Sequence, residues 1–427
     1  MDEQSQHLRM VEKRRVFYIP GYDPIHPRRY RELYRKESAS QGHISGYDIS
    51  IKAKLGEDGP YGWHVDATID GRKVTSTVEV LVWSDIVRDS MSNTIPATYL
   101  QLLRTAWTYI GSGALRRLMW MRKGPVIAAL YPVGMLLLQL LLAVLAGHLV
   151  GWGASYLFSL IPPIGDGIIA LVQPIVQLAF YWSSMIAVMV AALRWFKSKD
   201  GKLYAYYLMH DYAYSARKGG ESPPELEARM KEFANQIAAA LADKSIDEVL
   251  VVGHSSGAHL AISILSDLIR QKRIKRIGPA VSFLSLGQVV PMVSFLPRAW
   301  RLRADLNYLS RRSELTWVDV SAPGDGCSFA LCDPVSVTGV APAGKRWPLI
   351  LSAAFSQTLS PERWKKLRWR FFRLHFQYLC AFDVPGDYDY FQITAGPQTL
   401  GNRYRGRPPS KSRIDVTASK YTSMKAQ

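Results

Sequence analysis

The sequence predicts an α/β protein in which a mostly parallel sheet carries helices on both faces and a transmembrane helical hairpin is inserted into the chain. Two observations predict this class. Short apolar runs typical of buried strands alternate with amphipathic stretches typical of helices in both end portions of the 427-residue chain. This alternation favours parallel strands joined by helices. Between these portions, residues 116–202 contain two long apolar segments.

The first part of the predicted α/β domain covers residues 14–115. It follows residues 1–13, a polar segment that is too charged for a cleavable signal peptide. A strand that ends in a Pro-Gly turn comes first, and an amphipathic helix follows it. Two alternating runs between residues 63 and 83 then surround Asp70-Gly71, a pair typical of β-hairpin turns.

The inserted segment at residues 116–202 is predicted to cross a membrane twice. Its spans, residues 125–152 and 167–193, carry His148 as their one ionisable side chain, and each exceeds the ~20 residues that cross a bilayer. The connection between the spans has no Lys or Arg, whereas the outer flanks carry Arg116, Arg117, Arg122, Lys123, Arg194, Lys197, Lys199 and Lys202. Because cytoplasmic flanks collect cations, we expect both termini and the α/β domain to be cytoplasmic, on a bacterial-type inner or plasma membrane.

The second part of the α/β domain is predicted at residues 203–395. Ser222 and Glu225 have the spacing of a capping box at the start of a helix. Strands are expected at residues 248–252 and from residues 280 and 315. The alternation lapses at residues 334–372, which are interpreted as a cap or lid, and residues 396–427 form a basic, polar tail predicted to be disordered.

The charge balance and the cysteines limit the classes of partner and cofactor that the chain is expected to bind. Lys and Arg number 53 against 35 Asp and Glu, a formal charge of +18, which suits an anionic membrane face or a nucleic acid. No nucleic-acid-binding motif accompanies the excess, so no nucleic acid is expected and the lipid bilayer is the predicted partner. Cys327, Cys332 and Cys380 have neither a disulfide-like nor a metal-like spacing, so no metal and no cofactor are expected.

A G-x-S-x-G pattern in "VLVVGHSSGAHLA" contains the strongest catalytic candidate, Ser255. A short β-branched run precedes the pattern and a helix-forming run follows it. Gly253 and Gly257 flank the serine where side chains would obstruct a sharp turn between strand and helix. This context predicts a nucleophile elbow that exposes the hydroxyl of Ser255. The alternative is a Gly/Ser-rich turn that merely packs the helix.

The same stretch resembles the nucleophile elbow of the α/β-hydrolase superfamily, which includes lipases and esterases. The resemblance covers roughly residues 14–110 and 205–395. It implies an oxyanion hole made by the N–H of Ser256 and by a loop after an early strand, for which "FYIPGYDP" offers Tyr22 first and Gly21 second. The alternative for the Pro-Gly-Tyr sequence is a simple strand-ending turn.

The resemblance also implies an acid and a histidine after the serine. Two histidines follow Ser255. His259 lies one turn along the same helix and is expected to point away, so His375 is the predicted general base; the alternative is a structural histidine packed beside aromatic residues.

Three aspartates compete for the role of the acid. Asp325 lies in a Pro-Gly-Asp-Gly loop after an expected strand, the position from which the family orients its histidine. Asp333 comes next in preference, and Asp319, inside the expected strand, comes last. Each could instead be a turn former.

The predicted function is therefore a membrane-anchored serine hydrolase, of esterase or lipase type, that cleaves a carboxylic ester through a Ser-His-Asp triad. A run of aromatic and basic residues at 363–372 favours a site near the lipid surface and hence a lipid or acyl ester. The alternative substrate is a small soluble ester or amide, with the hairpin acting only as an anchor. A catalytically inactive membrane scaffold or partner-binding protein is the alternative from another class, and a channel component is poorly supported because the spans carry no charged residue.

Overall fold

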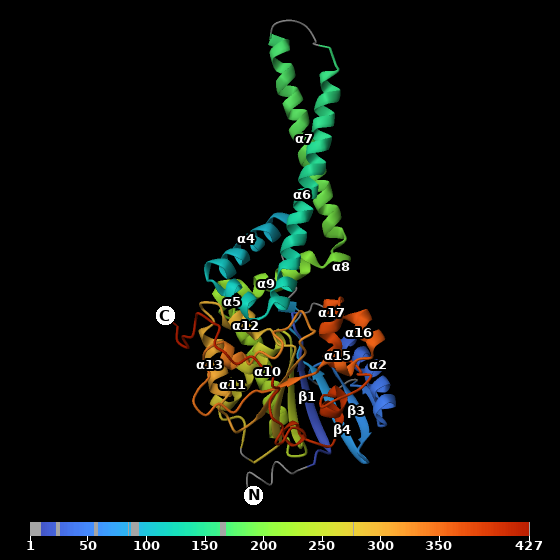
Figure 1. The fold of residues 1–427 in the computed structure, drawn as a ribbon, viewed down its shortest axis with the longest axis vertical. Helices are drawn as coiled ribbons and strands as arrows, with labels where there is room; N and C mark the ends of the chain where they lie inside the picture. The colour runs from blue at the N-terminus through green and yellow to red at the C-terminus, as the bar shows by residue number, and fades with distance from the viewer. Residues whose placement is uncertain are drawn as a thin grey trace. The chain divides into compact units, whose positions relative to one another are not determined.

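The computed structural model describes residues 10–22, 26–54, 59–83, 85–86, 94–162, 168–275 and 277–426. The chain forms two compact units (Figure 1). We call the first the α/β unit, which comprises Met1–Ser90, Ala106–Ala128 and Ser215–Gln427, and the second the helical unit, which comprises Met91–Thr105 and Ala129–Tyr214.

The α/β unit contains an eight-stranded sheet with the order β2-β3-β4-β1-β5-β6-β7-β8. The adjacent strands β4, β1, β5, β6, β7 and β8 are parallel to one another, and β3 is antiparallel to both of its neighbours, β2 and β4. Their bounds are β1 Lys13–Ile19, β2 Asp48–Ala53, β3 Gly62–Ile69, β4 Arg72–Val80, β5 Glu248–His254, β6 Ala280–Leu286, β7 Thr316–Ser321 and β8 Leu349–Ser352. The prediction of an α/β protein with a mostly parallel sheet is confirmed.

Local sequence explains the strands. All seven residues of β5 are buried, as expected for a central parallel strand covered on both faces. The predicted hairpin is the β3–β4 pair, in which Ile69 faces Arg72. Asp70 and Gly71 have φ of 52° and 69°, the left-handed values that a tight two-residue hairpin turn requires.

Helices cover both faces of the sheet. One apolar cluster joins side chains of β1 and β3–β8 to α2 (Arg28–Ser45), α18 (Tyr390–Ala395) and α19 (Leu400–Arg403). On the opposite face, α10 (Pro224–Ala242) and α11 (Gly257–Arg270) pack against β5, and α13 (Trp300–Leu309) packs on α11 (Figure 1). The remaining elements of this unit are α5 Ala114–Met121, η1 Arg217–Gly220, α12 Val290–Ser294, α14 Pro334–Val337, α15 Phe355–Thr358, α16 Pro361–Leu367, α17 Phe371–His375 and η2 Phe376–Leu379.

Three sequence-based expectations need correction in the α/β unit. The capping box at Ser222 does not form, because α10 begins after Pro223, which caps it without a side-chain hydrogen bond; the fixed φ of proline suits this first turn. Residues 334–372 are not a separate cap, since β8 lies within them and pairs with β7.

The third correction concerns the tail, residues 396–427, which was predicted to be disordered. As far as Ser423 it packs on the rest of the α/β unit: Tyr404 is buried, and the amide of Ala418 donates to the carbonyl of Val337. Arg303, itself buried, donates a 2.6 Å hydrogen bond to the carbonyl of Ser423. Composition indicates what the tail cannot bury by itself, but it does not indicate the partners that lie far away in sequence.

The helical unit contains two helices long and apolar enough to cross a membrane, as predicted. They are α6 (Lys123–Ser159), whose first residues belong to the α/β unit, and the stretch Val172–Ser198 of α7 (Ile168–Ser198). The predicted connection between the spans is helical through Ser159, and residues 163–167 lie outside the described part. This unit also holds α8 (Asp200–Leu203), most of α9 (Ala205–Ala216) and the first part of α4 (Ile95–Gly111).

Two glycines four residues apart let α6 and α7 approach closely. A Cβ on Gly147 would lie 2.6 Å from the carbonyl oxygen of Met185, and a Cβ on Gly151 would lie 2.8 Å from that of Tyr181. Small residues at this spacing are typical of helix pairs that pack in lipid. Nearby, His148 and the hydroxyl of Tyr181 form a 2.6 Å hydrogen bond, which gives the one ionisable side chain of the spans a partner.

Candidate active site

Ser255 lies at the turn between β5 and α11 with φ of 55°, a left-handed conformation that is rare for a non-glycine residue. Both flanking glycines are required by close contacts. A Cβ on Gly253 would lie 2.7 Å from the Cα of Ala258, and one on Gly257 would lie 2.1 Å from the carbonyl oxygen of Ile19. The turn is therefore sharp and strained, the local geometry of a nucleophile elbow.

The predicted oxyanion loop lies directly beside this serine. A Cβ on Gly21 would lie 3.0 Å from the Cβ of Ser255 and 3.4 Å from its Oγ. The ring of Tyr22 packs edge-on against Trp83, whose indole donates a 3.0 Å hydrogen bond to the carbonyl of Pro20. On the other side, Ser256 is the N-terminal cap of α11, where helix N–H groups have no partner within the helix and can stabilise an anion.

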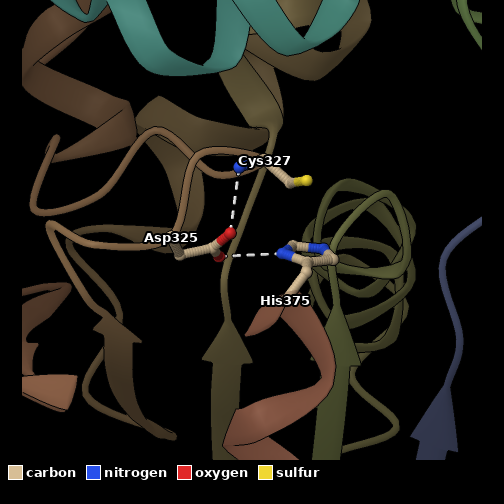
Figure 2. Close-up of side chains that lie close together, drawn as sticks. All are labelled: Asp325, Cys327 and His375. Carbon is tan, nitrogen blue, oxygen red and sulfur yellow. Dashed lines mark hydrogen bonds and ion pairs between the residues drawn. The ribbon is translucent and has the colours of Figure 1, made fainter. Parts of the chain in front are cut away.

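A buried histidine–aspartate pair completes the site (Figure 2). His375 Nδ1 and Asp325 Oδ2 are 2.8 Å apart, and both residues are buried. Asp325 comes from the loop after β7, and His375 ends α17. The hydroxyl of Tyr378 donates to the same carboxylate oxygen at 2.9 Å, and the amide of Cys327 donates to the other, also at 2.9 Å.

These partners keep Asp325 ionised. Burial opposes its charge, but the neighbouring His375 and the hydrogen bonds from His375 and the Cys327 amide outweigh burial, so the pKa of Asp325 lies below its ordinary value. An ionised carboxylate at Nδ1 places the proton of the imidazole on Nδ1 and leaves Nε2 as the basic nitrogen.

Ser255 and His375 both lie beside the carboxyl end of β6. The amide of Ser255 donates to the carbonyl of Leu286, the last residue of β6. The next residue, Gly287, has φ of 51°, and a Cβ there would lie 3.0 Å from His375 Cε1. His375 Nε2 is buried and has no hydrogen-bond partner in the described part of the chain. Catalytic hydrogen bonds are often longer in the absence of substrate, so this open nitrogen fits a base that awaits the serine proton.

His254, the residue before Ser255, contacts the candidate base His375 and was not among the site residues predicted from the sequence. Its ring stacks on that of His375 with centroids 4.7 Å apart, and its Nε2 lies 3.1 Å from the His375 carbonyl oxygen. Burial and the proximity of His375 lower the pKa of His254 to about 3. A neutral His254 can therefore hold the His375 backbone without adding a permanent charge next to the base.

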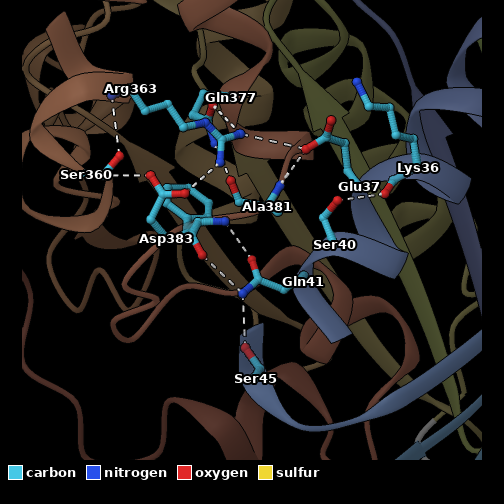
Figure 3. Close-up of polar contacts among 11 residues, drawn as sticks. Lys36, Glu37, Ser40, Gln41, Ser45, Ser360, Arg363, Gln377, Ala381 and Asp383 are labelled. Atoms are coloured by element: carbon cyan, nitrogen blue, oxygen red, sulfur yellow. Dashed lines mark hydrogen bonds and ion pairs between the residues drawn. The ribbon is translucent and has the colours of Figure 1, made fainter. Parts of the chain in front are cut away.

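The segment that carries His375 is fastened to α2 by polar contacts (Figure 3). Asp383 accepts 2.7 Å and 3.1 Å hydrogen bonds from the Ser360 amide and the Arg363 side chain, and Glu37 on α2 accepts a 3.0 Å bond from the Ala381 amide. Tyr378 adds a further link because its hydroxyl accepts a 2.9 Å bond from the Ala322 amide. Sequence reasoning missed these residues, since their partners are hundreds of positions away or on other elements.

The other two aspartates have structural partners instead of His375. Asp333 caps α14 by accepting from the amides of Val335 and Ser336, and it forms an ion pair with Lys345. Asp319 lies inside β7 and accepts a 2.6 Å bond from Ser285. Of the three candidate acids, Asp325 is the one hydrogen-bonded to His375. His259 carries no bond to this pair, and burial lowers its pKa to about 4.

Asp319 offers a stability prediction. Burial raises its pKa to about 7 despite the bond from Ser285, so folded Asp319 keeps a proton that the unfolded chain releases above about pH 4. The contribution of Asp319 to the free energy of unfolding therefore falls as pH rises from about 4 to 7 and is lost above that window. We expect Asp319→Asn to remove this slope and to raise the free energy of unfolding near pH 8 by roughly 1–3 kcal/mol.

Thermal unfolding of the full chain in detergent at several pH values measures this effect. Asp48→Asn, at an exposed position of β2, is the matched control and should leave the pH dependence unchanged. A lower melting temperature for Asp319→Asn near pH 8 would show that an ionised carboxylate is needed there, contrary to the prediction.

The pair and Cys327 also form a group with metal-ligand chemistry. One donor atom each from Asp325, Cys327 and His375 lies within 4.8 Å of the others (Figure 2). These three residues show no metal-like spacing in the sequence because they come from two separate segments. The Asp325–His375 hydrogen bond already engages one donor of each residue, and this geometry is that of the acid and base of a catalytic triad.

The first residues of α6 lie beside the loop that carries Asp325, within the α/β unit. A Cβ on Gly124 would lie 3.6 Å from the Cα of Gly326, and Arg122 donates a 3.0 Å bond to the carbonyl of Ala330. Gly326 in turn lies against the ring of Phe371, which a Cβ would meet at 2.9 Å. The long apolar helix therefore begins next to the candidate acid.

Comparisons with known proteins leave the family open. No protein-family model matches the chain, and neither the curated proteins nor the solved structures contain a match to it. The fold defines the class of protein, an α/β protein with a mostly parallel eight-stranded sheet and two helices long and apolar enough to cross a membrane.

Proposed function

We propose that this protein is a membrane-anchored serine hydrolase of the α/β-hydrolase type that cleaves a carboxylic ester. The observation that carries the proposal is the strained, left-handed Ser255 between β5 and α11, together with a buried Asp325–His375 pair whose histidine stacks on His254, the residue before Ser255. A glycine-flanked serine turn alone would pack a helix. A buried carboxylate that orients a histidine with an open Nε2 next to that turn is what acyl transfer requires.

The chemistry follows from these positions. His375 Nε2 accepts the proton of the Ser255 hydroxyl as Oγ attacks the ester carbonyl carbon. The negative charge on the carbonyl oxygen is stabilised by the N–H of Ser256 and by that of Tyr22 or Gly21. His375 then donates its proton to the leaving alcohol, and the acyl group stays on Ser255. Water, deprotonated by His375, attacks the acyl carbon; the acid is released as His375 returns the proton to Ser255 Oγ, and Asp325 holds the imidazole tautomer throughout.

The substrate class that we favour is a lipid or acyl ester. The apolar lengths of α6 and α7 and the cations that flank them support a transmembrane hairpin with both outer ends cytoplasmic. In the segment just before His375, Trp369 is 73% exposed and Phe371 and Phe372 are each 40% exposed. Arg368, Arg370 and Arg373 alternate with these rings. Exposed aromatic and cationic side chains beside the start of α6 suit contact with an anionic lipid surface.

An acyl-chain series tests this proposal. The full chain, purified in detergent and also reconstituted in nanodiscs, is given p-nitrophenyl esters of short and long fatty acids, with Ser255→Ala as the blank. We expect kcat/KM to rise at least about tenfold from short to long acyl chains, because each methylene buried in an apolar site adds binding energy. Equal activity on all chain lengths would leave a serine hydrolase for small esters. The absence of hydrolysis above the blank would remove the ester-hydrolase proposal.

A further inference from the structure

The helix α4 carries an apolar stripe along its exposed side. Four large side chains form this α4 stripe, each between 46% and 80% exposed: Leu100, Leu103, Trp107 and Ile110. Their spacing of three or four residues places them on one face of the helix. The opposite face is made of buried residues at the same spacing: Thr98, Leu102, Thr105 and Tyr109. Large apolar side chains that are exposed side by side mark a surface that contacts a partner or a membrane.

Within the helical unit, the inner face of α4 packs against α6 at the level of Leu136. Leu102 belongs to one apolar cluster with Leu136 and with buried residues of α9. The hydroxyl of Tyr99 donates a 2.9 Å hydrogen bond to the carbonyl of Leu136. The start of α4 is therefore fixed at a defined height along the long helix.

Leu136 lies where a stretch of α6 long enough to span a bilayer begins. The 37 residues of α6 extend over about 55 Å, which is more than the ~30 Å of hydrocarbon in a bilayer. From Leu136 to Ser159, the last residue of α6, the helix rises about 35 Å, close to that thickness. The turns before Leu136 contact protein instead, since Val126 is 1% exposed.

The register of α7 against α6 supports the same level. The two helices run antiparallel (Figure 1), and Gly147 lies against Met185. When this register is continued along both helices, Leu136 lies level with Phe196. Two cations flank that position, Arg194 and Lys197. Because cations collect at the cytoplasmic ends of membrane spans, the level of Leu136 and of the start of α4 is the edge of the hydrocarbon.

The charges around the α4 stripe suit the surface of an anionic leaflet. From residue 95 to residue 165 the sequence contains no Asp or Glu, and its Lys and Arg residues lie in or just after α4 and α5: Arg104, Arg116, Arg117, Arg122 and Lys123. Trp107 and Trp120 are 80% and 72% exposed, and tryptophan is enriched at the level of the lipid headgroups. An exposed apolar face accompanied by cations alone is typical of helices that lie in the membrane interface.

We propose that α4 lies in the interfacial layer of a lipid bilayer, with the α4 stripe among the headgroups and the first acyl carbons and with the membrane-spanning part of α6 beginning near Leu136. The span then starts later in the chain than residue 125, where the apolar run of the sequence begins. This inference rests on the membrane anchor of the proposed function and not on ester hydrolysis. It makes α4 a second membrane contact beside the hairpin.

Fluorescence quenching in nanodiscs tests the position of α4. The full chain is reconstituted as one copy per nanodisc of phosphatidylcholine and phosphatidylglycerol. A fluorophore is attached at Leu103→Cys or, as an independent second site of the α4 stripe, at Leu100→Cys. The wild type, carried through the same labelling, gives the background from the three native cysteines.

Two control sites are exposed apolar residues as well. Leu149→Cys places the fluorophore on α6 at a residue that is 68% exposed and lies between Leu136 and Ser159. Ile277→Cys places it at a residue that is 77% exposed and precedes the first residue of β6. Because β6 and β7 are parallel, Ile277 lies at the opposite end of the sheet from the loop after β7, where α6 begins.

We expect lipids that carry a nitroxide near the headgroup to quench the fluorophore at residues 100 and 103 at least about threefold more than at residue 277, and aqueous iodide to give the reverse order. Residue 149 should be shielded from iodide and quenched by a nitroxide deep in the acyl chain. These results together support the proposal.

Iodide quenching at residues 100 and 103 equal to that at residue 277, with residue 149 still shielded, would overturn the interfacial position of α4. The hairpin would then stand, and the α4 stripe would be left for a protein partner such as a second copy of the chain. Iodide quenching at residue 149 would overturn the membrane hairpin and the position of α4 with it. Each of these measurements is independent of ester hydrolysis, so the hydrolase proposal fails or stands separately.

Discussion

Ser255→Ala should abolish labelling by a fluorophosphonate probe and reduce ester hydrolysis by a factor of about 10³ or more. The probe forms a covalent bond with an activated serine hydroxyl, and the variant lacks the Oγ that His375 would deprotonate. The change should leave the fold intact, because alanine keeps the Cβ that contacts Gly21 and the φ of 55° is as strained for alanine as for serine. Gel fluorescence after labelling, together with the melting temperature, measures both effects.

The matched control is Ser40→Ala, which removes an exposed serine hydroxyl on α2 that donates to the carbonyl of Lys36. It should label like the wild type. Labelling of Ser255→Ala at the wild-type level would remove the serine-hydrolase assignment and would favour the alternative of a membrane scaffold that keeps the α/β fold. Loss of labelling with a melting temperature within a few degrees of the wild type would attribute the result to chemistry and not to unfolding.

The elements that the sequence predicts well are those whose signals are contiguous. The run of buried residues in β5, the Asp70-Gly71 turn and the two apolar helices each depend on neighbours along the chain. Ser255 belongs to this group, because the two glycines that its turn requires lie two residues away on either side. Local backbone sterics therefore explain why the elbow geometry could be expected.

The remaining features depend on contacts between distant segments. Tyr378 bonds to Asp325 across 53 positions, and His254 stacks on His375 across 121 positions; no local pattern marks either pair. The order of the tail likewise depends on a contact between distant segments. Arg303 is 1% exposed because its guanidinium donates to carbonyl groups of Ser294, Leu296, Pro297 and Ser423. A polar tail can thus be ordered by satisfying a buried cation, a contribution that composition does not reveal.

Asp325→Asn should reduce ester turnover by about 10⁴-fold while the fold and the position of His375 are preserved. The amide is nearly isosteric with the carboxylate and can still accept the bond from the Cys327 amide. However, it can donate a hydrogen bond to His375 Nδ1, which favours the tautomer with the proton on Nε2. His375 would then have no basic nitrogen towards Ser255, and the transition-state imidazolium would lose its neighbouring negative charge.

Asp333→Asn is the matched comparison, because it makes the same chemical change at the second candidate acid. Asparagine is as good an N-terminal cap as aspartate, so α14 should persist, although the loss of the ion pair with Lys345 should lower the free energy of unfolding by roughly 1–3 kcal/mol because Asp333 is buried. We expect turnover within about threefold of the wild type, since this variant should leave transition-state stabilisation at Ser255 almost unchanged. Initial rates on one ester for both variants decide the assignment. If Asp333→Asn is the variant that loses activity and Asp325→Asn retains it, the acid is Asp333, and the hydrogen bond between Asp325 and His375 has a structural role only.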